Sequence, residues 1–366
     1  MPWFLAAAAL TCTGIALVAS ATADPLNGVL FGAAAKAQVV WWVVSLVVSL
    51  AAARIPFAWW KELAVPGYIA SLLVILAMGV LAGSSLVPSI KGQCNWIVLG
   101  QFRVQPVEFI KLATLMSIAL LISSPGFEAR RFSHVCLGLV VAALPAAMLA
   151  REDLGSALTF PPMAFGMLMA AGMRGRDFTL LMVGGLAVIA LGISRLPQEG
   201  PKAYQYRRIQ AWLHPEAYAL TEGYQTARSV SAIGSGQYVG KGWSQGDQNR
   251  LGLIPEKHTD LISAVAGEEF GLIGMFILCA GYVTFAWLGL GLAGGVRDPC
   301  GRLIIVGFVC LVGGQAAINL SVATGLLPVT GVTLPFLSYG GSSLLATWFG
   351  LGIARSAGQT TKLPTA

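Results

Sequence analysis

The sequence predicts an all-α integral membrane protein in which ten transmembrane helices form one domain over residues 1–366. Hydrophobic residues make up 56% of the chain and charged residues only 11%, and the mean hydropathy is +0.74. So little polar surface cannot cover a soluble globule of this size. In addition, apolar stretches of about 20 residues, the length needed to cross a bilayer, recur along the chain.

Ten apolar stretches qualify as spanning helices. In chain order they cover residues 3–23, 38–53, 64–84, 104–123, 132–150, 154–173, 177–196, 261–292, 301–323 and 339–356. The second is short for a span, and the eighth is long enough to begin outside the bilayer or to tilt. The first ends in Ala21-Thr22-Ala23, which imitates a signal-peptide cleavage site. No Lys or Arg precedes its apolar run, so we expect this helix to be retained.

The placement of basic residues predicts how the helices are oriented, because short cytoplasmic loops collect Lys and Arg. With a cytoplasmic amino terminus, the inner loops and tail carry Arg54, Lys61, Arg130, Arg131, Arg174, Arg176, Arg297, Arg302, Arg355 and Lys362. The short outer loops carry only Lys36, Lys91, Arg103 and Arg151. We therefore expect both termini in the cytoplasm and a large extracytoplasmic loop, residues 197–260, between helices 7 and 8.

A second irregular stretch, residues 328–343, reads PVTGVTLPFLSYGGSS and holds two prolines and three glycines among apolar residues. Non-helical backbone at membrane depth survives only where protein or a water-filled cavity satisfies its polar groups. We therefore expect this stretch to line a cavity.

Acidic residues gather where the long outer loop joins the eighth helix: Asp260, Glu268 and Glu269. A carboxylate at the bilayer centre costs roughly 2.5–3.5 kcal/mol, so such residues usually mark a wet, functional site. If the helix begins at Asp260, then Asp260 and Glu268 lie about 80° apart around its axis and can face one cavity, while Glu269 points elsewhere. Asp260 is either an N-terminal helix cap or a general base.

Three further charged residues lie at predicted outer helix ends. Glu108 and Lys111 are three residues apart and are therefore neighbours on one helix face. They form either a structural ion pair or part of the site. Asp153, at the start of the sixth span, is either a helix cap or a site carboxylate.

The outer loop has a basic lining that includes Arg207, Arg208 and Lys257, interleaved with Tyr and Trp. Arginine forks suit bidentate capture of phosphate oxygens, and the alternative is a solvated loop attracted to anionic lipid headgroups. The sequence contains no nucleophile elbow, no HExxH and no P-loop, which disfavours acyl-enzyme, zinc and ATP chemistry. Two functions remain for a phosphorylated, lipid-linked substrate: base-assisted transfer onto a hydroxyl, or transport. Nucleic acid is not an expected partner.

Several motifs in fixed order resemble those of the shape, elongation, division and sporulation (SEDS) family of ten-span membrane glycosyltransferases. They are QPVEFIK at 105–111, DLG at 153–155, GYQ at 223–225, AIGSGQYVGKG at 232–242, IPEKHTD at 254–260, the Glu268-Glu269 pair and GVTLPFLSYGGSS at 331–343. The resemblance covers nearly the whole chain. The stretch GKGWSQGDQ at 240–248 is more similar to the rod-shape-determining branch than to the cell-division branch.

The resemblance implies a peptidoglycan glycosyltransferase of the bacterial cytoplasmic (inner) membrane. It would polymerise lipid II during wall elongation, with the elongation machinery and a class B penicillin-binding protein as partners. Asp260 aligns with the essential aspartate of the family. The other residues expected at the substrate cavity are Glu108, Lys111, Asp153, Arg207, Arg208, Lys257, His258, Glu268, Ser338 and Ser342.

The resulting hypothesis makes Asp260 the base that deprotonates the 4-hydroxyl of an acceptor N-acetylglucosamine. The leaving lipid pyrophosphate departs as an anion, stabilised by Arg207, Arg208 or a divalent cation such as Mg²⁺ or Mn²⁺. Two alternatives stay open: a flippase or transporter for lipid II, and a noncatalytic scaffold for a penicillin-binding protein.

Overall fold

Helices build nearly all the regular structure of this chain. The computed structural model describes residues 2–23, 29–90, 94–100, 102–150, 153–195 and 203–359. The longer helices are α1 (Pro2–Ala21), α2 (Ala33–Arg54), α3 (Phe57–Val80), α4 (Val107–Ile122), α5 (Phe132–Leu149), α7 (Phe160–Ala170), α8 (Gly175–Ser194), α12 (Ile262–Gly294), α13 (Pro299–Ala323) and α14 (Gly341–Gly358). The others are α6 (Leu154–Ala157), α9 (Ala203–Leu213), α10 (Tyr224–Gly236) and α11 (Asp247–Arg250). Strands β1 (Ile97–Leu99) and β2 (Phe102–Val104) pair antiparallel, with Ile97 opposite Val104.

The prediction of an all-α membrane protein is confirmed. In the described part of the chain, seven helices are long and apolar enough to cross a bilayer: α1, α2, α3, α5, α8, α12 and α13. The predicted fourth, sixth and tenth spans correspond to α4, to α6 with α7, and to α14, which do not meet the same length and hydropathy criterion. The total of ten spans therefore stays a prediction.

Two predicted helix boundaries differ from the structure. The expectation that the second span is short is wrong, because α2 has 22 residues. It begins in alanine-rich sequence that is weakly apolar but favours helix. The eighth span is long, as expected, since α12 has 33 residues, and it is broken at Gly271 (φ 61°, ψ −160°). It also begins at Ile262, so Asp260 lies just before the helix.

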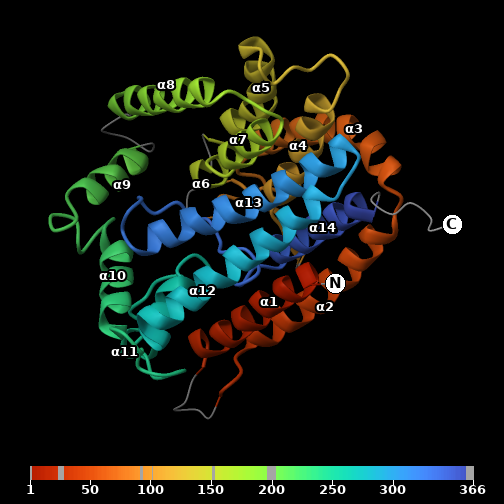
Figure 1. Cartoon of the computed structure of the whole chain (residues 1–366). Helices are drawn as coiled ribbons and strands as arrows, with labels where there is room; N and C mark the ends of the chain where they lie inside the picture. The colour runs from red at the N-terminus through yellow and green to blue at the C-terminus, as the bar shows by residue number, and fades with distance from the viewer. Residues whose placement is uncertain are drawn as a thin grey trace.

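Helix α13 lies at the centre of the bundle and packs against α4, α7, α12 and α14 (Figure 1). In the apolar 18-residue stretch of α13, 67% of the residues are buried, compared with 17% in the corresponding stretch of α3. The large hydrophobic side chains of α3 that remain exposed, such as Leu73 and Leu76, are what a lipid-facing helix presents.

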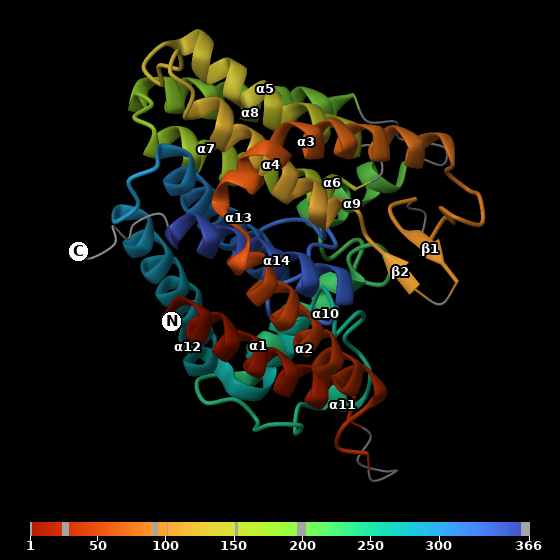
Figure 2. The same cartoon turned by 90° about the vertical axis from the view of Figure 1, so that its right-hand side faces the viewer.

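The start of α1 and the end of α14 lie on one side of the molecule, away from α9, α10 and α11 (Figures 1 and 2). Figure 2 places the β1–β2 hairpin away from those two helix ends as well. This arrangement agrees with termini on one side and the long loop on the other. Which side faces the cytoplasm stays a prediction.

Candidate active site

Residues 324–340, here called the connecting segment, join α13 to α14 without helical structure. Neighbouring side chains satisfy its backbone carbonyls, as irregular backbone at membrane depth requires. The carbonyl of Val332 accepts a hydrogen bond from Asn319 Nδ2 (2.7 Å), and that of Thr333 accepts one from Gln315 Nε2 (3.1 Å). The carbonyl of Pro335 accepts from the Tyr282 hydroxyl (2.6 Å). The segment is thus hydrogen-bonded to both α12 and α13.

The carboxylate of Asp260 faces this segment at Gly331. A Cβ atom built on Gly331 would lie 3.7 Å from Asp260 Oδ2. Gly331 has φ +74°, a conformation that L side chains rarely adopt, so glycine leaves room beside the carboxylate without backbone strain. The N-cap residue of α12 is Leu261, not Asp260. The helix-cap interpretation of Asp260 is therefore wrong.

The turn that carries Asp260 is held at three consecutive carbonyls. The carbonyl of His258 accepts from Tyr339 N (2.8 Å), and that of Thr259 accepts from Ser338 Oγ (2.6 Å). The carbonyl of Asp260 itself accepts from Asn319 Nδ2 (2.7 Å). Ser338, expected at the substrate cavity, thus uses its hydroxyl to fix the backbone, and the His258 ring packs against the Tyr339 ring (centroids 5.6 Å apart).

The Glu268 side chain contacts the loop around α11. Its side chain is fully buried, and it accepts hydrogen bonds from the backbone N–H groups of Gln248 (2.8 Å) and Asn249 (3.0 Å). It also pairs with Lys241 Nζ (3.0 Å). Because Asp260 lies outside the helix, the helical angle used to relate the two carboxylates does not apply. Glu268 instead braces the loop around α11.

Lys257 is turned toward the same loop. Its Nζ donates to the carbonyl of Asn249 (2.8 Å). Burial lowers the pKa of Lys257, and the nearby charges of Glu269 and Glu268 oppose that shift. Glu269 accepts hydrogen bonds from Ser20 Oγ and from Asn249 Nδ2 and so ties α1 and α11 to α12. It therefore has a structural position.

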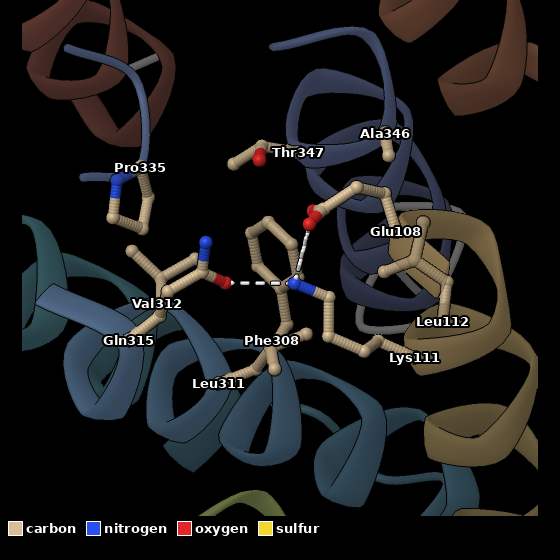
Figure 3. A pocket seen from close by; sticks show the side chains of 10 residues that line it. All are labelled: Glu108, Lys111, Leu112, Phe308, Leu311, Val312, Gln315, Pro335, Ala346 and Thr347. Carbon is tan, nitrogen blue, oxygen red and sulfur yellow. Dashed lines mark hydrogen bonds and ion pairs between the residues drawn. The ribbon is translucent and has the colours of Figure 1, made fainter. Parts of the chain in front are cut away.

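Glu108 and Lys111 form the ion pair that their spacing predicted (Figure 3). Lys111 Nζ lies 2.9 Å from Glu108 Oε2 and donates to Gln315 Oε1 (2.9 Å), and all three residues are buried. Ser343 Oγ lies 3.5 Å from Glu108 and 3.0 Å from Thr333 Oγ1. The adjoining cavity measures about 10 Å³, enough for one water. A sugar does not fit there, so the pair braces α4 against α13 and α14.

Asp153 caps α6, which confirms the structural interpretation. Its Oδ1 accepts from Ser156 N (2.9 Å), and its Oδ2 accepts from Ser156 Oγ (2.7 Å) and Asn95 Nδ2 (3.1 Å). A Cβ atom on Gly155 would collide with the carbonyl of Thr330. The capped turn therefore packs directly on the connecting segment, one residue from Gly331.

The structure separates the two expected arginines. Arg207 pairs with Glu222 (2.6 Å) and is half exposed, whereas Arg208 Nη1 donates to the carbonyl of Val329 (3.5 Å). Trp212 Nε1 also donates to the connecting segment, at Gly325 (3.0 Å), so α9 lies along it. Arg208 is thus the arginine brought toward Asp260. Ser342, at the start of α14, donates to Arg103 O (3.4 Å) and accepts from Gln105 N (3.2 Å).

Sequence reasoning missed Gln315, Asn319 and Asn249. Gln315 and Asn319 lie four residues apart on α13, and a pair of buried amides on one face of an apolar span was the signal that could have found them. Among the residues that the structure describes, no three His, Cys, Asp or Glu side chains gather as a metal site, so the Mg²⁺ or Mn²⁺ expectation stays a prediction.

A sequence model of the cell cycle proteins FtsW, RodA and SpoVE matches residues 2–363. The chain belongs to this family. It is 36% identical over 358 residues to a probable peptidoglycan glycosyltransferase FtsW of Geobacter metallireducens, covering 95% of this chain and 92% of the relative. It is 32% identical over 314 residues to the peptidoglycan glycosyltransferase MrdB of Escherichia coli, covering 86% and 82%.

Solved structures agree with the family assignment. The fold matches a chain of a peptidoglycan synthase complex with a TM-score of 0.76 and 29% identity over 98% of this chain and 96% of that one. It matches the rod shape determining protein RodA of Thermus thermophilus with a TM-score of 0.69 and 26% identity, over 98% and 95%. This SEDS chain is accordingly a peptidoglycan glycosyltransferase of the bacterial inner membrane.

Proposed function

We propose that the protein polymerises lipid II, the undecaprenyl-pyrophosphate-linked disaccharide peptide, into glycan strands, with Asp260 as the general base. The observation that carries the proposal is the fixed turn of Asp260, whose carboxylate faces Gly331 of the connecting segment. A base held in one geometry avoids reorganisation during reaction and typically contributes about 10²–10⁴-fold to the rate.

In the proposed step, the 4-hydroxyl oxygen of the acceptor N-acetylglucosamine attacks the anomeric carbon of the lipid-linked donor. A new C–O bond forms, the bond from that carbon to the pyrophosphate oxygen breaks, and the configuration inverts. Asp260 takes the hydroxyl proton, and the lipid pyrophosphate leaves as an anion. Arg208, which reaches Val329, is the best-placed described arginine to stabilise that charge. Mg²⁺ or Mn²⁺ bound by the phosphates would supply the same stabilisation.

The direct test uses purified full-length protein in detergent with lipid II and a gel readout of glycan strands. Asp260→Asn keeps the side-chain shape, removes the base and should lower polymer yield at least 100-fold. Asp247→Asn is the matched control, because Asp247 is an exposed carboxylate paired with Lys241, and it should keep near-normal activity. Normal polymerisation by Asp260→Asn would refute the assignment.

The same assay separates the alternatives. Detergent leaves no second compartment, so strands made there exclude transport as the sole function. A noncatalytic scaffold would yield no strands from the purified wild-type chain under any condition.

We further propose a role in elongation beside a class B penicillin-binding protein. The matched synthase complex coordinates polymerization and crosslinking, which supports a crosslinking partner. The stretch at 240–248 supports elongation, while relatives named FtsW and MrdB both align. Depleting the protein from its own bacterium should produce round cells, and long filaments would assign it to division instead.

A further inference from the structure

Asn319 lies on α13 beneath the proposed base and is almost completely buried, with 1% of its surface exposed. Its Nδ2 atom donates to Asp260 O and to Val332 O, both at 2.7 Å. Its Oδ1 atom accepts from Ser263 Oγ (3.0 Å). Both amide hydrogens are therefore committed to carbonyls, one on each side of the contact between Asp260 and the connecting segment.

The chemistry of these bonds requires an asparagine-like group. An Asn side chain offers two N–H donors on one nitrogen and a carbonyl acceptor, and this site uses both functions. Aspartate has the same shape but no pair of donors. A buried amide left without partners costs roughly 1–3 kcal/mol, so an unpaired asparagine would be a poor choice for the centre of a membrane bundle.

The two carbonyls that Asn319 holds lie on either side of the contact between the Asp260 carboxylate and Gly331. One belongs to Asp260 itself, and the other belongs to Val332, which directly follows Gly331, the residue that the carboxylate faces. One nitrogen atom thus bridges the turn of Asp260 and the connecting segment. The preceding carbonyls of His258 and Thr259 are held separately by Tyr339 and Ser338. The turn therefore retains two anchors when Asn319 is changed.

We propose that Asn319 is a positioning residue for glycosyl transfer, which presents the Asp260 carboxylate at a fixed distance from the connecting segment. The inference rests on the proposed role of Asp260 as the base. Misplacing a reacting group by about 1 Å can cost about 10²-fold in rate. Replacing Asn319 should consequently lower kcat for lipid II polymerisation by roughly 10- to 100-fold, with KM changed by less than about threefold because no substrate contact is removed.

The variants Asn319→Asp and Asn319→Ala remove both donated bonds, and two controls accompany them. Ser263→Ala removes the bond accepted by Asn319 Oδ1 but keeps both donated bonds, so it should lower kcat by less than either Asn319 variant. Ser321→Ala changes a polar residue two positions along the same helix that takes no part in this network, and it should match the wild type. Each variant is purified in the same detergent and checked for monodispersity and thermal stability before kinetics.

Hydrogen–deuterium exchange supplies a readout that does not depend on activity. The amides of Thr259 and Leu261 donate to Glu256 O, so they report the rigidity of the turn. In the Asn319 variants exchange should rise locally over residues 254–261, whereas Ser321→Ala should leave it unchanged. Exchange that rises throughout the bundle would show a general folding role and overturn the inference.

The outcomes also separate this inference from the proposed function. If Asp260→Asn is inactive while both Asn319 variants keep wild-type kcat, the base stands and the positioning role fails. If Asp260→Asn stays active, the proposed function itself fails. Should Asn319→Ala not fold, Asn319→Asp, which preserves the shape of the side chain, decides the matter by the same two measurements.

Discussion

Replacing Lys111 with methionine should destabilise the protein strongly, and replacing its partner Glu108 as well should restore part of the loss. The side chains of Lys111 and Glu108 are 2% and 8% exposed, and their charged atoms are 2.9 Å apart. Removing one member of a buried ion pair leaves an uncompensated charge and costs about 3–5 kcal/mol. Besides Lys111, the neighbour shown for the Glu108 carboxylate is the Ser343 hydroxyl at 3.5 Å, too distant to replace the cation.

The double variant Glu108→Leu with Lys111→Met removes both charges. It leaves Gln315 Oε1 without the lysine donor, a loss worth about 1–3 kcal/mol. The double variant should therefore be more stable than Lys111→Met alone. Glu108→Leu should thus stabilise the Lys111→Met variant, although the same change in the wild type would leave Lys111 as an unpaired buried charge. A buried pair predicts this difference, because apolar side chains of similar volume often replace such pairs at little cost.

The melting temperature in detergent measures the effect. An unfolding entropy of about 2.1 cal/mol/K per residue gives roughly 1.3 °C per kcal/mol for 366 residues. Membrane helices persist in detergent and lower that entropy, so Lys111→Met should lose at least about 4 °C. Lys61→Met is the matched control, since the Lys61–Asp298 pair is partly exposed (34% and 25%) and such pairs contribute about 0–1 kcal/mol. A double variant less stable than Lys111→Met would refute this reasoning.

Three further changes test the surroundings of Asp260. Gly331→Ala introduces a Cβ 3.7 Å from Asp260 Oδ2 on backbone with φ +74°, and it should reduce polymerisation at least tenfold while the protein still purifies as a monodisperse species. Asp153→Ala removes the cap of α6 and should lower stability by about 1 kcal/mol, seen as a small drop in melting temperature. Asp153→Asn should keep most of the stabilisation, because Asn is also a good cap residue. Arg208→Ala should lower polymer yield more than Arg207→Ala, because Arg207 is already paired with Glu222; equal losses would contradict the separation of the two arginines.

Hydropathy and motifs predicted the helices better than they predicted the contacts between them. The membrane class and the Glu108–Lys111 pair followed from local patterns, since a span needs length and apolarity and an ion pair needs helical spacing. The break between α6 and α7 was missed although Pro161 and Pro162 occupy the first turn of α7, where proline usually starts a helix.

The helical angle used to relate Asp260 to Glu268 does not hold, and the physical reason is specific. Periodicity relates two residues only if both belong to one helix, and α12 starts two residues after Asp260. The actual partners of the Asp260 turn come from residues 319 and 338–339, about sixty to eighty positions away in sequence. A single sequence contains no local signal for such pairings, although buried amides in an apolar helix mark where to look.

The hydrogen bonds around the connecting segment also help to decide whether the protein acts as an enzyme or as a transporter. A transporter must open a path for a sugar pyrophosphate through the bundle, whereas polymerisation requires access from the outer side alone. Beside Glu108, Lys111 and Gln315 the adjoining cavity measures only about 10 Å³, the space of one water, and the Gln315–Thr333 bond joins α13 to the connecting segment. Opening a path there would break the Glu108–Lys111 pair and the neighbouring hydrogen bonds, which contribute about 1 kcal/mol each. A transferase that takes its substrates from one side does not need to break these interactions. They can stay formed during the reaction and hold the connecting segment, which the Asp260 carboxylate faces.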